Sequence, residues 1–460
     1  MRFTLPSASR SALFLCVALT TGVLAGGCSK PKDKTVRAHV SGTLALSPEI
    51  DPEDDGSGFE ILILSQLSGD LDTLASAVTA PGGTFAVDVV APERGVFPLS
   101  ISRGSDPLAL EELVLADGDS VSIRGTFPLE NRTLRIVSYE NGAWAALRNT
   151  KAAFQQTVYG LVQNQTYTPE TMGQAVAQTS NVLWSLRDTY PNTMGAIMAE
   201  AESIGLLESW NDSLALARFG ELKPDHAVIV DLVRAARRST ARLSGQAAAI
   251  DLVNRYAGLV EKENRAGVRS ELVMAHMDSS ALDLAVEVAR SLTSEEGDWG
   301  TWAQKAVYEL ENLMPGMPAP EIGLVDLTGR GVNLAALRGN VVMLEFFAPD
   351  GEFFATYEER AAIVALGDRF PLVSVSVSLE PDSLYTLGML QEAPMAGTFV
   401  IDPAGAESVT AKAYNVNVLP TRVLIDPEGR IVGKYVGGAF DALSRDLAGL
   451  FQTYAARQQP

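Results

Sequence analysis

The sequence predicts an α+β protein of several domains: an N-terminal antiparallel β-sandwich, a helical middle region and a C-terminal α/β domain. Three observations support this fold class. Short alternating apolar and polar runs, separated by Gly, Pro and Asp, extend from about Arg37 to Val137. Ala, Leu, Glu, Arg and Gln then recur with helical periodicity to about Leu313. Beyond that point apolar strand-like runs alternate with helical segments, which is typical of α/β folds.

Length and composition agree with a chain of several globular domains. A chain of 460 residues exceeds the usual size of one domain, and a content of 47% hydrophobic and 20% charged residues is ordinary for globular proteins. The formal net charge of -20 argues against nucleic acid as a partner, because binding it relies on Lys and Arg that neutralise phosphates. The predicted regions are a signal peptide (1–27), a tether (28–36), a β-rich domain (37–137), a helical region (138–312) and a C-terminal domain (313–460).

The N-terminus has the pattern of a targeting segment. Arg2 and Arg10 precede an apolar stretch that begins at Ala12 and runs to about Ala25. This stretch is too short to span a bilayer stably. The stretch ends in Leu24-Ala25-Gly26-Gly27-Cys28, which resembles the bacterial lipobox. That resemblance implies a lipid anchor on Cys28, a membrane as partner, and a place in the bacterial cell envelope, at the outer membrane or the periplasmic face. The alternative is a plain secretory signal with an incidental cysteine.

The β-rich region has seven predicted strands. Breaks such as Pro81-Gly82-Gly83 and Asp117-Gly118-Asp119 separate them, which favours a small antiparallel sandwich or barrel. The strands are Val40–Leu46, Phe59–Leu64, Phe85–Val89, Val96–Ile101, Glu112–Leu115, Ser120–Arg124 and Thr133–Ile136.

The helical region begins near Asn141. Thr168-Pro169-Glu170 predicts a helix start, because Thr can cap a helix and Pro is tolerated at the first helical position. All five tryptophans lie in this region, and we interpret them as packing anchors. The three histidines, His39, His226 and His276, are far apart and lack the ligand spacing of a zinc site. The sequence therefore predicts no metal site and no cofactor.

The C-terminal region predicts a βαβ unit. Val341–Phe347 is a nearly continuous apolar run, as expected for a strand buried on both faces. Residues Thr356 to Arg369 have a helical pattern, and the β-branched run from Leu372 to Val377 predicts a second strand. Two strands with such a crossover are expected to run parallel.

Several short motifs in this region, in a consistent order, resemble thioredoxin-like proteins of the envelope reductase and peroxiredoxin-related group. The motifs are Ala319-Pro320, Leu327-Thr328-Gly329, Leu337-Arg338-Gly339-Asn340, Phe346-Phe347-Ala348, Tyr414-Asn415-Val416, Leu419-Pro420-Thr421 and Val423 to Val432 followed by Gly437. The β-rich region, with Gly83-Thr84-Phe85, resembles the domain that precedes thioredoxin-like domains in envelope lipoproteins. The resemblance implies a thioredoxin-like fold for residues 313–460.

The chain departs from this family where the family has Trp-Cys-x-x-Cys. Gly351 and Phe354 stand in the two cysteine positions, and the only cysteines of the chain are Cys16 and Cys28. Disulfide exchange and peroxide reduction both need a thiolate. We therefore predict no catalytic residue and interpret the protein as a redox-inactive binding or scaffold module. The alternative, which the resemblance alone suggests, is a thiol-disulfide oxidoreductase or antioxidant protein.

By the same resemblance, Pro420 aligns with the cis-proline that lies beside the family's active site. Two interpretations remain open. Pro420 preserves the fold, or the segment around it still binds a peptide or protein partner without reducing it. The residues of this predicted groove are Asp350, Phe353, Phe354, Leu419, Pro420 and Thr421.

Overall fold

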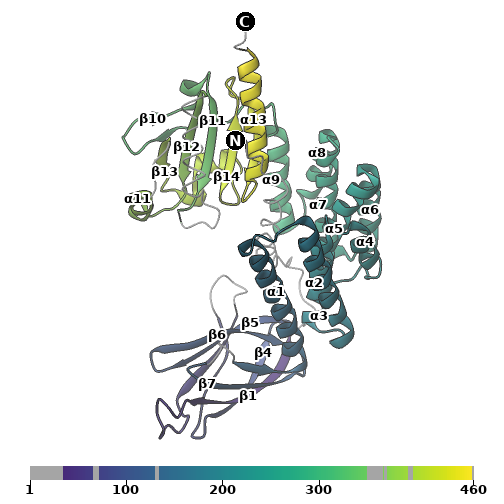
Figure 1. Ribbon diagram of the computed structural model, residues 1–460, viewed down its shortest axis with the longest axis vertical. Helices are drawn as coiled ribbons and strands as arrows, with labels where there is room; N and C mark the ends of the chain where they lie inside the picture. Colours follow the sequence, from purple (N-terminus) through teal and green to yellow (C-terminus); the bar gives the residue numbers. More distant parts are fainter. Residues whose placement is uncertain are drawn as a thin grey trace. The chain divides into compact units, whose positions relative to one another are not determined.

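The computed structural model describes residues 35–65, 72–129, 134–349, 366, 370–391 and 397–457. It is a mixed α/β structure with four sheets in these ranges (Figure 1). The chain divides into two compact units, and within the described residues the division falls between Ala275 and His276. No helix in the described part of the chain is long and apolar enough to cross a bilayer. The predicted signal peptide and Cys28 lie outside the described residues.

The first unit begins with two four-stranded sheets, in the strand orders β4-β1-β7-β8 and β3-β2-β5-β6. The strands are β1 (Val36–Leu46), β2 (Phe59–Ser65), β3 (Asp72–Val78), β4 (Thr84–Ala91), β5 (Gly95–Arg103), β6 (Asp106–Leu115), β7 (Ser120–Phe127) and β8 (Arg135–Val137). Strand β3 was not predicted, because none of its residues is fully buried and only Leu74, Ala75 and Ala77 pack against the core, which gives a weak apolar pattern. Strand β6 is longer than predicted, because its first residues are also mostly exposed.

The prediction of a wholly antiparallel sandwich is wrong for one pair of strands. β1 and β7 run parallel, with Val40 opposite Val121 and Thr43 opposite Arg124. All strands of the second sheet lie between β1 and β7 in the sequence. Strands β1 and β7 are therefore far apart in the sequence and are not joined by a hairpin, and such a separation permits parallel pairing.

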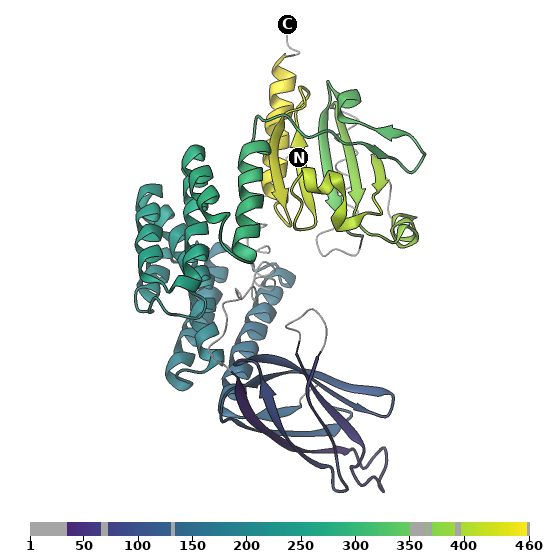
Figure 2. The ribbon, with the colours of Figure 1, turned by 180° about the vertical axis from the view of Figure 1, so that it is seen from behind.

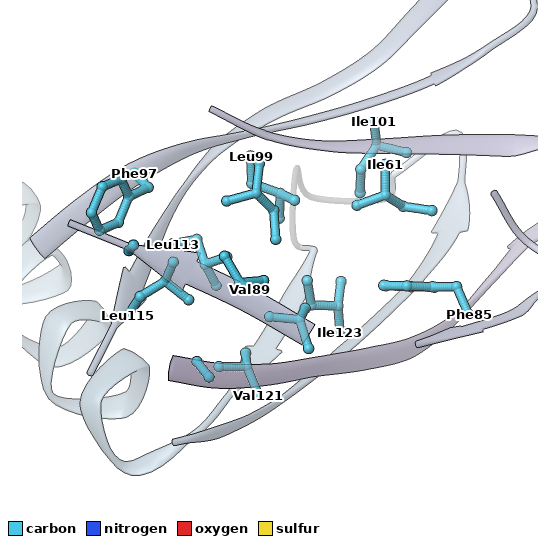
Figure 3. Packing of buried hydrophobic residues seen from close by; sticks show 14 of the residues in the cluster. Ile61, Phe85, Val89, Phe97, Leu99, Ile101, Leu113, Leu115, Val121 and Ile123 are labelled. Atoms are coloured by element: carbon cyan, nitrogen blue, oxygen red, sulfur yellow. The ribbon is translucent and has the colours of Figure 1, made fainter. Parts of the chain in front are cut away.

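The core of this sandwich lies between the two sheets. The labelled side chains in Figure 3 come from both sheets, with Leu99 and Ile101 of β5 on one side and Val121 and Ile123 of β7 on the other. These residues belong to one buried apolar cluster. Burial of alternate residues along each strand is what a sandwich requires, because successive side chains point to opposite faces.

Helix α1 (Tyr139–Gln163) is fixed to the sandwich at its first turn. Ser138 caps the helix and accepts a hydrogen bond from the Asn141 backbone N–H. The buried Asn141 side chain accepts from the Val114 N–H at 2.9 Å and donates to the Val114 carbonyl at 2.8 Å. Its neighbour Glu140 is paired with Arg94 and accepts from the Met194 N–H at 2.9 Å. The β-rich region therefore passes into the helices through a hydrogen-bonded joint.

Most of the remaining helices of the first unit pack on the helix that follows them in the sequence. They are α2 (Pro169–Thr189), α3 (Met194–Leu207), α4 (Asp212–Phe219), α5 (Ile229–Ser244), α6 (Gln246–Leu259) and α7 (Lys262–Asp278), whose last three residues belong to the second unit. The predicted start at Thr168 is confirmed, since Thr168 caps α2 and Pro169 is its first residue.

The second unit contains two helices followed by a five-stranded sheet in the order β13-β12-β11-β14-β15. Its elements are α8 (Leu282–Leu292), α9 (Asp298–Asn312), β9 (Leu324–Val325), β10 (Gly331–Val332), η2 (Leu334–Leu337), β11 (Val341–Phe347), β12 (Leu372–Ser378), α11 (Ser383–Gln391), β13 (Thr398–Ile401), η3 (Gly405–Glu407), α12 (Val409–Ala413), β14 (Thr421–Ile425), β15 (Ile431–Val436) and α13 (Phe440–Arg457). Strands β11 and β12 pair in parallel, as predicted, and β14 and β15 are antiparallel. Apart from Leu366, the helix predicted over 356–369 lies outside the described residues.

The position of β11 within the sheet explains why its sequence is almost continuously apolar. Val341 and Met343 pack in one cluster with Leu447 of α13, which lies along one face of the sheet (Figure 1). Val342 and Leu344 belong to a second cluster on the opposite face. A strand covered on both faces cannot show the alternation of a half-buried strand.

We predict that Asn141→Ala destabilises the first unit by about 2–4 kcal/mol, because it leaves the buried N–H and C=O of Val114 without partners. Urea unfolding followed by circular dichroism measures this change. Asn164→Ala is the control, since Asn164 is exposed at the end of the same helix. Equal midpoints for the two variants would contradict the role of the joint.

Candidate functional site

The predicted groove segment lies at one end of the five-stranded sheet. Phe346 near the end of β11 is opposite Thr421 at the start of β14. The Leu419–Pro420 peptide bond is cis. The Thr421 hydroxyl donates to the Val418 carbonyl at 2.6 Å, and the Gly437 N–H donates to the Pro420 carbonyl at 2.8 Å. The segment before β14 is therefore fixed beside the end of β11.

The residues of this segment differ in their exposure. Pro420 and Thr421 are buried, and Leu419 is partly buried against the core of the sheet. Val418 is 53% exposed. Among the described residues of this segment, Val418 and part of Leu419 form the surface available to a ligand, while Pro420 and Thr421 are packed. The other predicted site residues, Asp350, Gly351, Phe353 and Phe354, lie outside the described residues.

A buried ion pair lies one residue further into the sheet. Arg422 of β14 is directly opposite Glu345 of β11, and its Nε donates to the Glu345 Oε1 at 2.9 Å. The Ser376 hydroxyl of β12 donates to the Glu345 Oε2 at 3.1 Å. The side chains of Glu345 and Arg422 are only 4% and 3% exposed. The pair therefore joins the three neighbouring strands at the centre of the sheet.

Sequence reasoning missed this pair, although a signal was available. Glu345 is the only charged residue in Val341–Phe347, and Arg422 is the only one in Thr421–Ile425. A single charge inside an apolar strand needs a partner, because burying an unpaired charge is costly. Two such strands with opposite charges predict a cross-strand pair once they are known to be neighbours.

The geometry gives this pair a structural role. Both carboxylate oxygens of Glu345 accept a hydrogen bond, and the Arg422 guanidinium also donates to the Gly437 carbonyl at 3.4 Å. A guanidinium stays protonated in proteins. The positive charge next to Glu345 is thus permanent, and the pair is the charge-balanced arrangement that a buried carboxylate requires.

The tyrosine beside the site also packs as a structural residue. Tyr414 is fully buried, and the centroid of its ring lies 5.6 Å from the centroid of the Phe346 ring. The Tyr414 hydroxyl donates to the Pro320 carbonyl at 2.5 Å. Burial raises the pKa of the Tyr414 phenol above its ordinary value, so the group is a neutral donor.

The three histidines do not form a metal site in the described part of the chain. His39 pairs with Asp88 on the sandwich surface, and His226 lies 3.2 Å from Glu200 and accepts from the Val228 N–H. In the described ranges, no three His, Cys, Asp or Glu side chains are placed to hold a metal ion together.

Comparison with known proteins gave matches only among solved structures. No family model matches the chain, and no curated protein matches it. One similar structure is a candidate thiol:disulfide interchange protein DsbE from Chlorobium tepidum, at 26% identity and a TM-score of 0.27, covering 30% of this chain and 99% of that chain. Another is a thiol-disulfide oxidoreductase from Bacteroides fragilis, at 24% identity and a TM-score of 0.25, covering 28% of this chain and 98% of that chain. A third is the thioredoxin domain of a thiol-disulfide oxidoreductase from Bacteroides vulgatus, at 22% identity and a TM-score of 0.26, covering 31% of this chain and 99% of that chain.

We predict that Arg422→Met destabilises the second unit by about 3–5 kcal/mol, because it leaves the Glu345 carboxylate buried without its counter-charge. The double variant Glu345→Leu with Arg422→Met should recover much of that loss, since it removes both charges. Thermal unfolding of the two variants measures the difference. Arg445→Met, at an exposed position of α13, is the control. A double variant less stable than Arg422→Met would contradict this assignment.

Proposed function

We propose that this protein is a cell-envelope lipoprotein whose residues 313–460 form a redox-inactive thioredoxin-like domain that acts as a binding or scaffold module. The observation that carries the proposal is the absence of cysteine from residues 29–460. A β-rich domain (37–137) and a helical region (138–312) precede that domain in the proposed layout.

Two features support a thioredoxin-like domain here. The motifs from Ala319-Pro320 to Gly437 occur in the order that the family has them. The central sheet combines the parallel strands β11, β12 and β13 with the antiparallel strands β14 and β15. In that sheet the segment Leu419–Thr421 leads into β14 beside the end of β11.

The same chain lacks the group that would run the family's chemistry. Attack on a disulfide or a peroxide needs a thiolate, and Gly351 and Phe354 have no side chain that ionises. Non-covalent binding does not need one. An extended peptide can bind through main-chain hydrogen bonds and apolar contacts, and exposed Val418 next to Leu419 supports such a contact.

The competing function is thiol-disulfide exchange or peroxide reduction. It rests on the resemblance to the family alone, and no residue of 29–460 supplies the nucleophile. The two functions therefore differ in a simple measurement of turnover.

We predict that the Cys28→Ser protein shows no insulin-disulfide reduction and no peroxide consumption above background, because it then has no cysteine after the signal peptide. Insulin turbidity and peroxide consumption assays measure these activities, with a thioredoxin as positive control. Turnover by the Cys28→Ser protein would refute the redox-inactive assignment.

We predict that the full-length protein binds an unfolded, thiol-blocked chain and that Val418→Asp weakens this binding about tenfold or more, since it places an unpaired carboxylate in the interface. The probe is fluorescently labelled, reduced and carboxymethylated α-lactalbumin, and binding is measured by anisotropy. Val409→Asp is the matched control, because Val409 is 83% exposed in the same unit. Equal binding by the two variants would show that the segment before β14 is not the binding surface.

We predict that Cys28→Ser abolishes fatty-acid labelling and releases the protein from membranes, because one side chain carries the anchor. Metabolic labelling with a fatty-acid analogue and membrane fractionation measure both effects. Cys16→Ser should leave labelling unchanged. Persistent labelling of Cys28→Ser would leave the plain secretory signal as the explanation of the N-terminus.

A further inference from the structure

Helix α9 lies alongside the five-stranded sheet and contacts the loop that leads into Leu419–Thr421 (Figure 2). The Tyr308 hydroxyl donates to the Ala413 carbonyl at 3.0 Å. The Lys305 Nζ donates to the Asn417 Oδ1 at 2.6 Å. The Asn415 Nδ2 donates back to the Lys305 carbonyl at 3.1 Å. Bonds in both directions therefore join this helix to the loop.

Glu309 of α9 connects the same loop to the sheet. It accepts from the Asn415 Nδ2 at 2.7 Å and from the Lys434 Nζ of β15 at 2.7 Å. The Lys434 Nζ also donates to the Asn415 carbonyl at 3.1 Å. The side chains of Lys434 and Glu309 are only 14% and 23% exposed, which reduces screening of the pair by solvent. Helix, loop and strand thus meet at Asn415.

The backbone at Asn415 shows why this side chain is suited to the position. Its φ is 48°, in the left-handed region that Asn tolerates better than most residues. The side chain donates to α9, and the Asn415 carbonyl accepts from Asn417 and from Lys434. The loop therefore reverses direction at Asn415 and is held to the helix at the same residue.

We infer that α9 is a positioning element for the segment Leu419–Thr421. Asn417, which Lys305 binds, immediately precedes the exposed Val418, and the Val418 carbonyl is held by the Thr421 hydroxyl. The chain from Asn417 to Thr421 is thereby fixed at both ends, at one end by α9 and at the other by β14. A displacement of α9 would move the surface formed by Val418 and Leu419.

The positioning role thus falls to α9, a helix that lies before the predicted start of the C-terminal domain at residue 313. Helix α9 also packs against α8. A ligand or partner that shifts the α8–α9 pair would change the position of the loop before β14. Binding of a ligand to that loop would in turn shift the position of α9. The consequence for ligand binding rests on the proposed function, whereas the positioning of the loop does not.

Hydrogen exchange of the full-length protein tests the positioning directly. Asn415→Gly keeps the left-handed backbone and removes the two bonds donated to α9, so exchange of peptides covering 413–419 should accelerate about tenfold. Exchange in β11 should stay unchanged. The control is Asn192→Gly, which replaces an Asn with a φ of 62° in the other unit. Unchanged exchange of residues 413–419 in Asn415→Gly would overturn the inference.

Binding of the carboxymethylated α-lactalbumin probe separates a positioning role from a merely structural one. Lys434→Met should weaken binding about fivefold or more, and Lys434→Arg should retain it, because a guanidinium can still pair with Glu309. If the wild type binds the probe and Lys434→Met and Asn415→Gly bind it equally well, α9 does not position the site and the inference fails. If the wild type binds no probe, the proposed function fails, and the exchange result alone decides whether α9 holds the loop.

Discussion

The second unit depends on one cross-strand ion pair, Glu345 with Arg422, at the centre of its sheet. The pair lies between the two strands that bring the site together, and both side chains are almost fully buried. A shift of one residue in the pairing would turn every side chain of a strand to the opposite face and leave both charges unpaired. The pair therefore favours the register that sets Phe346 opposite Thr421, and with it the place of Leu419–Thr421.

The surface of the site follows from that register. Pro420 and Thr421 are packed, whereas Val418 is exposed and the loop before it is bound to α9. Residues 29–460 contain no thiol, and the described residues before β14 form a fixed backbone segment with apolar surface at Val418 and Leu419. Under the proposed function this surface binds a chain without exchanging a disulfide with it.

Those parts of the fold with a local signature could be predicted from the sequence. The run Val341–Phe347 predicted β11, and Thr168-Pro169 predicted the start of α2. Strand β3 was not predicted, because its partly buried side chains, mostly alanines, give only a weak apolar pattern. The parallel pairing of β1 with β7 was not predicted, because the local pattern of a strand does not show which distant strand becomes its neighbour.

The same limit applies to the site. The segment Leu419–Thr421 was found through motifs, which are local in sequence. The Glu345–Arg422 pair, the Asn141 joint and the contact of Asn415 with α9 each connect residues that are far apart in the chain. The single charged or amide residues in these apolar or loop segments can be recognised in the sequence. Their partners cannot, because these depend on the tertiary fold.

The most direct test of a binding module without redox chemistry is to map where the full-length protein is protected when carboxymethylated α-lactalbumin is bound. Hydrogen exchange with and without the probe supplies this map. We expect slower exchange at residues 417–421 and at the end of β11, with no covalent adduct. Protection confined to the β-sandwich or to helices α1 to α7, or a mixed disulfide with an unblocked probe in the Cys28→Ser protein, would contradict it.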